Sequence, residues 1–299
     1  MNKPVALITG GARGIGFATA RRLASDHRIA LLDLDQDSLA LAAARCGTDT
    51  ITVVCDITDQ AQVDAAVAEV VAQAGGIDVL FSNAGIGAGG SLRLLDPEVL
   101  EATINVNLIG NWRIIWACLP HLIERRGYVI ANASASALLP AMGIGAYASS
   151  KAALEQLMNV LRTEVAHLGV DVGVSYFWFV GTDMVDGAER EMGRLGGLRS
   201  EMPGPLKGIV SVETVGERLA LGIRTRARRV VAPRWVTPVF YLRGFLGGMI
   251  DRQAAEIATE LDEATAERIE QSDSFAAAFR GTQAGHHAAA DRVGRKLGQ

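Results

Sequence analysis

Short apolar runs alternate with longer segments of helical periodicity through most of the chain. The runs lack the polar alternation of a strand with one face in water, so they predict strands buried on both faces of a parallel sheet. Between them, apolar residues recur three and four positions apart, which predicts helices with one buried face. This alternation is typical of an α/β fold with a doubly wound sheet. The six expected strands are residues 4–9, 28–32, 50–55, 77–81, 128–132 and 170–177.

The same pattern predicts one domain followed by an extension. Neither a repeat nor a linker is evident before about residue 250, so we expect a single domain over residues 1–250. Residues 251–299 are rich in Ala, Glu and Arg and predict a helical C-terminal extension. The apolar segment 235–250 is short and interrupted by Pro238 and Arg243, which favours packing on the core or on another subunit. Contact with a membrane interface is the alternative.

Composition narrows the functional classes. With a net charge of −4 and a pI near 5.8, the 299 residues offer no basic field for nucleic acid. The three cysteines are scattered without metal-ligand or disulfide spacing, and His286-His287 has no companion ligands, so we expect no metal site. Without a cleavable leader pattern or an apolar run of about 20 residues, the chain is expected to be cytoplasmic and to lack a transmembrane segment.

A glycine-rich turn connects the first strand to the first helix through Gly10, Gly14 and Gly16. Gly10 permits the tight turn, Gly14 lets backbone approach a pyrophosphate, and Gly16 allows close packing of helix against sheet. Because the N–H groups of such a turn bind phosphate, its position between strand and helix indicates dinucleotide binding.

Asp33 ends the second expected strand, seventeen residues after Gly16, where a ribose-binding carboxylate is expected. Such a carboxylate accepts hydrogen bonds from the ribose hydroxyls of NAD and repels the 2′-phosphate of NADP, so NAD is favoured over NADP. Arg13 is the opposing signal, because a cation in the glycine turn could meet that phosphate; it could equally be solvated or lie over the adenine. Asp56, after the third strand, could bind the adenine amino group, with Ile57 as an apolar wall.

Tyr147 and Lys151 lie four residues apart in a helical segment, thirteen residues after Ser134. Residues at this spacing share one helix face. A cation about 4 Å from the phenol, at an effective dielectric of about 20, contributes roughly 4 kcal/mol, which would lower the pKa of Tyr147 towards neutrality. The tyrosine could then serve as a general acid/base while Ser134 hydrogen-bonds the oxygen of an alcohol or ketone.

Other candidates follow the fourth strand and converge on the same place. The small residues of Asn83-Ala84-Gly85 would let a cofactor lie against bare backbone. Asp96-Pro97 predicts the start of a long helix that carries Asn107. All candidates follow strands or lie on the next helix, so they should meet in the crevice at the carboxyl ends of the strands.

Together these residues resemble the classical short-chain dehydrogenase/reductase family over roughly residues 3–235. The resemblance implies a Rossmann-type sheet of seven parallel strands with helices on both faces, the seventh at residues 229–232. It also implies a nicotinamide cofactor and a homodimer or homotetramer. The motifs that carry it are Thr9-Gly10-x3-Gly14-Ile15-Gly16, Asp56, Asn83-Ala84-Gly85, Asn107, Ser134 and Tyr147-x3-Lys151.

The resemblance assigns four catalytic residues. Tyr147 would be the acid/base, Lys151 would hold the nicotinamide ribose and lower the tyrosine pKa, Ser134 would orient the substrate oxygen, and Asn107 would support a water-linked proton relay. The full expected cofactor-binding set is Gly10, Arg13, Gly14, Ile15, Gly16, Asp33, Asp56, Ile57, Asn83, Ala84, Gly85, Tyr147, Lys151, Val180 and Thr182.

Two regions bear on the substrate. Phe177-Trp178 stands where the family usually carries Pro-Gly, although Val180 and Thr182 are retained; the two aromatic residues could line an apolar substrate wall. By the resemblance, residues 185–210 form a substrate lid. Its Met and Leu residues suggest a hydrophobic substrate, or they pack the lid itself.

The expected function is an oxidoreductase that interconverts a secondary alcohol and a ketone, acting on CH–OH with NAD, or NADP, as hydride acceptor. An NADPH-dependent carbonyl reductase is the first alternative. A non-catalytic dinucleotide-binding protein is the second. A different chemistry at the same site, such as epimerisation or dehydration, is the third.

Overall fold

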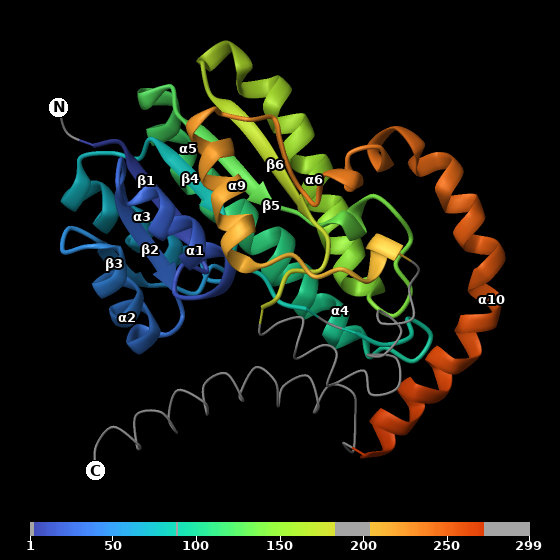
Figure 1. Ribbon diagram of the computed structural model, residues 1–299. Helices are drawn as coiled ribbons and strands as arrows, with labels where there is room; N and C mark the ends of the chain where they lie inside the picture. The colour runs from blue at the N-terminus through green and yellow to red at the C-terminus, as the bar shows by residue number, and fades with distance from the viewer. Residues whose placement is uncertain (1–2, 88, 183–203, 272–299) are drawn as a thin grey trace.

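The computed structural model describes residues 3–87, 89–182 and 204–271 of the 299-residue chain. At its centre is a seven-stranded sheet in the order β3-β2-β1-β4-β5-β6-β7, with every neighbouring pair parallel (Figure 1). The strands are β1 Val5–Thr9, β2 Arg28–Asp33, β3 Ile51–Val54, β4 Val79–Ser82, β5 Tyr128–Asn132, β6 Asp171–Phe177 and β7 Arg229–Ala232.

Helices cover both faces of this sheet (Figure 1). One layer consists of α1 Gly14–Leu23, α2 Gln36–Cys46 and α9 Val212–Arg224. The other consists of α3 Gln60–Ala74, α5 Asn111–Arg125 and α6 Gly145–Val165. The remaining longer helices are α4 Pro97–Ile104 and α10 Val239–Gln271. Short helical turns are η1 Asn105–Gly110, η2 Ala135–Ala137, η3 Ala166–Leu168, η5 Gly204–Lys207 and η6 Arg234–Val236.

The central strand β1 explains the apolar runs. All five of its residues are buried. Because successive side chains point to opposite faces, Val5 and Leu7 enter the core beneath α3, α5 and α6, while Ala6 and Ile8 enter the core beneath α1, α2 and α9. A strand covered on both faces has no polar side, so its sequence is continuously apolar. The strand order reverses between β1 and β4, which opens a crevice at their carboxyl ends.

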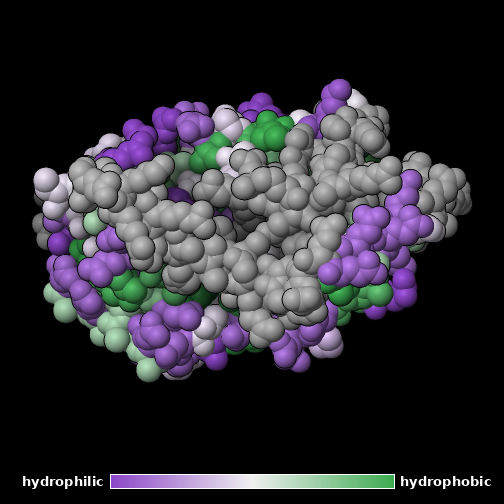
Figure 2. All heavy atoms as spheres, turned by 90° about the horizontal axis from the view of Figure 1, so that it is seen from below, coloured by the Kyte–Doolittle hydropathy of each residue, from purple (hydrophilic) through white to green (hydrophobic). Residues whose placement is uncertain are grey.

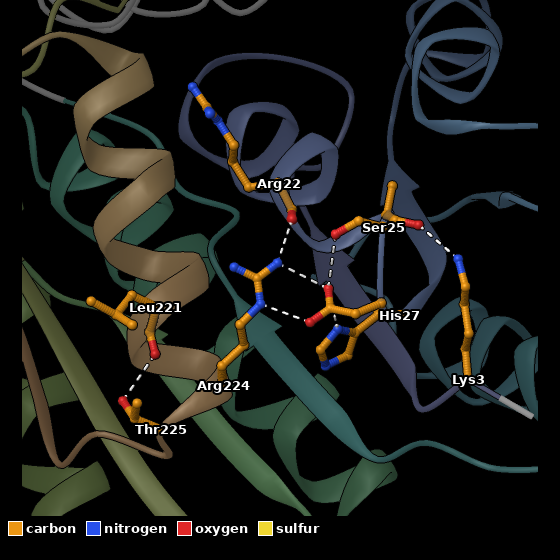
Figure 3. Close-up of polar contacts among 9 residues, drawn as sticks. Lys3, Arg22, Ser25, His27, Leu221, Arg224 and Thr225 are labelled. Atoms are coloured by element: carbon orange, nitrogen blue, oxygen red, sulfur yellow. Dashed lines mark hydrogen bonds and ion pairs between the residues drawn. The ribbon is translucent and has the colours of Figure 1, made fainter. Parts of the chain in front are cut away.

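Helices α1 and α9 are distant in sequence but pack closely together. Gly216 of α9 permits this approach, since a Cβ there would lie 2.8 Å from the backbone carbon of Ala18. At the amino end of β2, the Arg224 guanidinium donates to both carboxylate oxygens of Asp26, at 2.7 and 2.9 Å, and to the carbonyl oxygen of Arg22 at 2.7 Å (Figure 3). The hydrogen bonds from Arg224 hold the pKa of Asp26 well below its usual range.

The expected long helix is present but changes its winding in the middle. Asp96 caps its start by accepting the N–H of Glu98 at 2.9 Å. The helix continues through α4, the π-helical segment η1 and α5. Such π-helical turns occur mostly as local bulges and often at functional sites. Here the segment carries Asn107, which is fully buried.

The C-terminal helix α10 begins before the expected domain boundary and crosses it. Trp235, Val239 and Phe240 pack against the core, as expected for the apolar segment. In contrast, Tyr241 and Phe245 expose 80% and 72% of their surface. The division at residue 250 therefore falls within a helix and stays a prediction, and residues 272–299 lie outside the described residues.

The expected Rossmann-type fold is confirmed, including its seven parallel strands. The predicted strands 128–132 and 229–232 have the observed bounds, and the others differ by one or two residues at one or both ends. Differences of this size are ordinary for element ends, where backbone pairing rather than the apolar pattern decides the last residue.

A glycine within β6 generates a stability prediction. A Cβ on Gly173 would overlap the Tyr128 hydroxyl oxygen and lie 2.6 Å from the carbonyl oxygen of Ala227, which accepts the Tyr128 hydroxyl proton at 2.8 Å. We expect Gly173→Ala to lower the free energy of unfolding by about 1–3 kcal/mol, because the buried neighbours must move. The control Gly244→Ala has open space around its Cβ and should be neutral or stabilising. Urea denaturation measures both, and an unchanged midpoint for Gly173→Ala would contradict the close packing.

Candidate active site

The glycine turn places an open helix N-terminus at the carboxyl end of β1. Gly10 and Gly14 have φ angles of 60° and 54°, in the left-handed region that favours glycine. A Cβ on Gly16 would overlap the carbonyl oxygen of Gly10, so this glycine lets the helix start against the turn. Ile15 packs against the core beneath α1, α2 and α9. Arg13 is exposed, and its side chain does not cap the first N–H groups of α1.

The two acidic residues at the end of β2 are used differently. Asp33 accepts the N–H of Ala12 at 3.1 Å and that of Leu34 at 2.8 Å, so its carboxylate is fixed beside the glycine turn. Asp35 caps α2. Burial raises the pKa of Asp35, but hydrogen bonds from Ser38 and Asp37 and the charge of Arg13 together hold it below its usual value. Arg13 therefore lies within the field of an acidic neighbour.

Asp56 and Ile57 follow β3 and point to different partners. The Asp56 carboxylate accepts the backbone N–H of Thr58 at 2.8 Å and its hydroxyl at 2.7 Å, which fixes the turn before α3. Ile57 is buried, and a Cβ on Gly110 would lie 2.9 Å from its Cγ1. Ile57 thus packs against the π-helical segment that carries Asn107.

A chain of side-chain amides joins the carboxyl ends of four strands. Asn83 donates to the carbonyl oxygens of Thr9 at 3.1 Å and Gly10 at 3.3 Å. Its own oxygen accepts from the amide of Asn132 at 3.0 Å, and the oxygen of Asn132 accepts from the Ser175 hydroxyl at 2.9 Å. Asn132 is absent from the expected site residues; its position at the end of β5, next to the candidate serine segment, is the signal that could have indicated it.

Asn107 reaches the site through the backbone after β4. Its amide nitrogen donates to the carbonyl oxygen of Ile86 at 2.9 Å and to the Ser150 hydroxyl at 3.0 Å, and its oxygen accepts the N–H of Ile86 at 2.8 Å. A Cβ on Gly85 would lie 3.0 Å from the Asn107 oxygen and 3.2 Å from Lys151 Nζ. The small residue predicted here therefore allows an amide, a lysine and bare backbone to meet.

Asn111, another residue absent from the expected set, supports this meeting point. It accepts the Ser82 hydroxyl and donates to the carbonyl oxygen of Ala84 at 2.9 Å. It thereby fastens the end of β4 to the first turn of α5. Its signal in the sequence is its spacing of four residues from Asn107, on the same helix face.

Tyr147 and Lys151 share one face of α6, as predicted, but their electrostatic relation differs from the expectation. Lys151 Nζ lies 5.7 Å from the centroid of the Tyr147 ring and donates to the carbonyl oxygen of Asn132 at 2.9 Å. Burial raises the pKa of Tyr147, while a hydrogen bond with the Ser134 side chain acts to lower it. The expected lowering of this pKa towards neutrality by Lys151 is therefore wrong for this arrangement, because desolvation outweighs the stabilisation of the phenolate.

Ser134 is held in place by its neighbour Ser136. The Ser134 oxygen accepts the Ser136 N–H at 3.1 Å and the Ser136 hydroxyl at 2.9 Å. With its oxygen accepting, its own proton remains available to donate towards the Tyr147 side. Ser136 thus orients Ser134, the serine identified by its spacing from Tyr147.

The segment after β6 closes the site beside the glycine turn. Val180 pairs with Val210, and a Cβ on Gly14 would lie 3.7 Å from the Thr182 methyl group. Phe177 is buried in the core beneath α1, α2 and α9, so it does not form the apolar substrate wall considered for it. Trp178 donates its indole N–H to the carbonyl oxygen of Leu206 at 2.7 Å. Most of the expected lid, up to residue 203, lies outside the described residues.

The site faces the underside of the molecule in Figure 1, where the carboxyl ends of the strands lie. Figure 2 looks at this side and shows hydrophilic and hydrophobic described residues mixed around its edge. Within the described ranges, His, Cys, Asp and Glu form no group of three that could hold a metal ion. His286-His287 lies outside those ranges.

The buried lysine generates a stability prediction. Lys151 is 3% exposed, and burial lowers its pKa from 10.5 to about 8. Below pH 8 the folded protein must bury the charged form, at a cost of about 3 kcal/mol from this difference in pKa. Between pH 8 and 10.5 the unfolded chain binds more protons, so this cost disappears as pH rises.

We therefore expect Lys151→Met to raise the free energy of unfolding at pH 7 by about 1–3 kcal/mol, and the gain to shrink towards pH 10. Urea denaturation of both proteins at several pH values measures this difference. The control Lys3→Met removes an exposed lysine and should change little at any pH. A Lys151→Met protein less stable than the wild type at pH 7 would contradict the desolvation argument.

Comparisons with known proteins give the family of the chain. The sequence matches the model of the short chain dehydrogenase family over residues 4–193. It is 32% identical to (+)-borneol dehydrogenase 1 of Salvia officinalis over 209 residues, 68% of this chain and 80% of that protein. It is 34% identical to the oxidoreductase UcpA of Escherichia coli over 191 residues, 62% of this chain and 73% of that protein.

Solved structures share the fold. Levodione reductase superimposes with a TM-score of 0.72 at 23% identity, covering 78% of this chain and 96% of that one. A short chain dehydrogenase/reductase of Burkholderia phymatum in complex with NAD gives a TM-score of 0.71 at 24% identity, covering 86% of this chain and 95% of that one. With the fold, the glycine turn and the family match in agreement, the chain belongs to the short-chain dehydrogenase family of oxidoreductases.

Proposed function

We propose that this oxidoreductase interconverts a secondary alcohol and a ketone with a nicotinamide cofactor, NAD being preferred. The observation that carries the proposal is the meeting of Tyr147, Ser134, Lys151 and Asn107 at the carboxyl ends of β4 and β5. A phenol, a hydroxyl donor, an ammonium and an amide in one place can exchange a proton with a substrate oxygen.

The residues around the glycine turn fit a dinucleotide. The turn of Gly10 and Gly14 and the uncapped N–H groups of α1 suit a pyrophosphate, and a Cβ on Gly14 would project towards Thr182. Asp33 would hold the adenosine ribose. The other expected binding positions, Ile15, Gly16, Asp56, Ile57, Asn83, Ala84, Gly85 and Val180, support the same bound position.

In the proposed mechanism, residues of this chain transfer the proton of the substrate hydroxyl group. A bound nicotinamide supplies the acceptor for hydride in alcohol oxidation and the donor in ketone reduction. Ser134 donates a hydrogen bond to the substrate oxygen, and Tyr147 takes the hydroxyl proton in oxidation or gives its own in reduction. Lys151, protonated at pH 7 because its pKa is about 8, stabilises the phenolate that follows proton donation.

The raised pKa of Tyr147 bears on direction. At neutral pH the residue is a phenol, which is the form that donates a proton to a ketone oxygen. Alcohol oxidation needs the phenolate and is expected to gain from rising pH, until Lys151 loses its own charge. The side-chain amide of Asn107 is already hydrogen-bonded to the Ile86 backbone and to the Ser150 hydroxyl. Its role in the proposed relay is therefore to hold the backbone beside Lys151.

A hydrophobic, bulky secondary alcohol is the proposed substrate class. The name of the (+)-borneol dehydrogenase relative indicates a cyclic secondary alcohol, which supports including such alcohols in a first screen. Cyclohexanol and octan-2-ol provide simple cyclic and linear probes. Epimerisation or dehydration stays an alternative, because the same residues can move protons without net cofactor turnover.

The assembly and location of the protein stay predictions. We propose a homodimer or homotetramer, supported by Trp116 of α5, which exposes 55% of its surface beside the half-buried Trp112. No helix in the described ranges has the length and apolar character to cross a bilayer. The proposed cytoplasmic location rests on the composition, in which the three cysteines are scattered as in proteins that keep their thiols reduced.

Removing the phenol oxygen tests the acid/base. We expect Tyr147→Phe to lower kcat by about 10²–10⁴-fold while NADH binding is unchanged, because the ring remains and the proton carrier is lost. Steady-state oxidation of cyclohexanol and fluorescence titration with NADH measure the two effects. The control Tyr241→Phe makes the same change on an exposed side chain and should leave both unchanged. A Tyr147→Phe enzyme with a near-normal rate would refute the assignment.

Parallel titrations with NADH and NADPH test the cofactor. We expect tighter binding of NADH, because the fixed Asp33 carboxylate repels a 2′-phosphate. Asp33→Asn should reduce the preference by about tenfold, since neutralising the charge removes that repulsion. The control Asp37→Asn alters an exposed carboxylate in the first turn of α2 and should not. Tighter NADPH binding by the wild type would instead favour an Arg13-dependent carbonyl reductase, and no binding of either would favour a non-catalytic protein.

A further inference from the structure

The far part of α10 is fastened to a loop after β4 that borders the candidate site. We call residues 89–95 the site loop. The Ser91 N–H donates to the Thr265 hydroxyl at 3.0 Å, and the Ser91 hydroxyl donates to the carboxylate of Asp262. Arg93 donates from Nε and Nη2 to the other Asp262 oxygen, both at 2.8 Å. One carboxylate of the C-terminal helix therefore holds two residues of the loop.

The serine and threonine side of this contact is buried, whereas Arg93 leaves 67% of its side-chain surface exposed. Ser91 and Thr265 are 6% and 3% exposed, and Leu261, one residue before Asp262, is 8% exposed. Hydrogen bonds from Ser91 and Arg93 lower the pKa of Asp262, so the carboxylate is ionised at neutral pH. The neighbouring Glu263 is exposed, and Figure 2 shows hydrophilic residues along the side where α10 lies.

The site loop is also joined to the first turn of α6, which carries the tyrosine. The N–H of Gly90 donates to the carbonyl oxygen of Gly143 at 2.7 Å, and Gly90 pairs with Ile144. A Cβ on Gly145 would lie 2.6 Å from the Leu92 side chain, so this side chain packs directly on the Gly145 backbone. Gly145 is two residues before Tyr147, and the loop therefore supports the start of the helix that presents the phenol.

An apolar cluster provides a second connection between α10 and the site. Ile269 of α10 packs against a cluster formed by Ala146 of α6 and Val99 of α4. Ile86, which precedes the site loop, and Leu95, the last residue of that loop, pack against the same cluster. Ala146 directly precedes Tyr147. Ile86 is the residue whose backbone N–H and carbonyl oxygen are both held by Asn107. Contacts of α10 thus reach the neighbours of two proposed catalytic residues.

We propose that α10 belongs to the substrate side of the active site and that Asp262 is a positioning residue. Through Ser91 and Arg93 it holds the site loop against the start of α6, which keeps Tyr147 and the Ile86 backbone in place. This inference rests on the proposed function. It also accounts for the extension beyond residue 250, whose helix then completes the catalytic unit rather than following it.

The test compares Asp262→Asn with a matched ion pair elsewhere. Asp262→Asn keeps the shape but removes the charge that binds Ser91 and Arg93. The control Asp26→Asn removes the same kind of carboxylate from Arg224, between α1 and α9 at the amino ends of the strands (Figure 3). Both variants lose one Arg–Asp pair, so a general loss of stability should appear in both.

The first readout is the kinetics of cyclohexanol and octan-2-ol oxidation, at a temperature at which all variants are folded by circular dichroism. We expect Asp262→Asn to lower kcat/KM about tenfold with NADH affinity unchanged, since the disturbance lies on the substrate side. Asp26→Asn should keep wild-type kinetics. Ser91→Ala combined with Asp262→Asn should cost little more than Asp262→Asn alone, because the two act through one contact.

The second readout does not depend on turnover. Hydrogen exchange followed by mass spectrometry should be faster in residues 84–95 and 143–151 of Asp262→Asn, and unchanged there in Asp26→Asn. If the wild type oxidises neither alcohol, the proposed function fails on these probes while faster exchange still supports the connection. Unchanged exchange in those segments, or faster exchange with wild-type kinetics on a probe that the wild type oxidises, would overturn the inference.

Discussion

The amide chain from Asn83 to Asn132 is the interaction on which the site depends. Parallel strands end in carbonyl groups without partners inside the sheet, and here the Asn83 amide donates to those of Thr9 and Gly10. The same chain fixes the glycine turn against β4 and leaves the carbonyl oxygen of Asn132 to hold Lys151. A cofactor surface and a proton-transfer group are thereby positioned by one set of hydrogen bonds.

Lys151 shows how such a site opposes stability. A lysine 3% exposed, with a pKa of about 8, is costly to bury at neutral pH. Its known partner is a neutral carbonyl oxygen, which offsets only part of the desolvation. Burial also raises the pKa of Tyr147, but the phenol is neutral at pH 7 in both the folded and the unfolded chain, so only Lys151 carries this cost. Retaining a buried lysine at such a cost is consistent with a catalytic rather than a structural role.

The C-terminal helix changes how the limits of the catalytic unit are drawn. Composition separates residues 251–299 from the rest, but α10 begins at Val239 on the core, runs down one side of the molecule (Figure 1) and contacts the loop before α4 through Asp262. The role of a segment that follows a Rossmann-type sheet can therefore be inferred from the residues that the segment contacts. Here the contacts lie beside the first turn of α6, where the position of a side chain has chemical consequences.

Local patterns determined six of the strands, the glycine turn and the shared helix face of Tyr147 and Lys151, because each depends on residues close together in the sequence. Apolar runs specify buried strands, and a spacing of four specifies one helix face. Tertiary structure alone decided the raised pKa of Tyr147, the burial of Phe177 and the hydrogen bond from the Asn132 amide to Asn83. It also decided the contact of Asp262 with Ser91, 171 residues away. Desolvation and long-range contacts depend on what the whole fold brings together, and no short stretch of sequence contains that information.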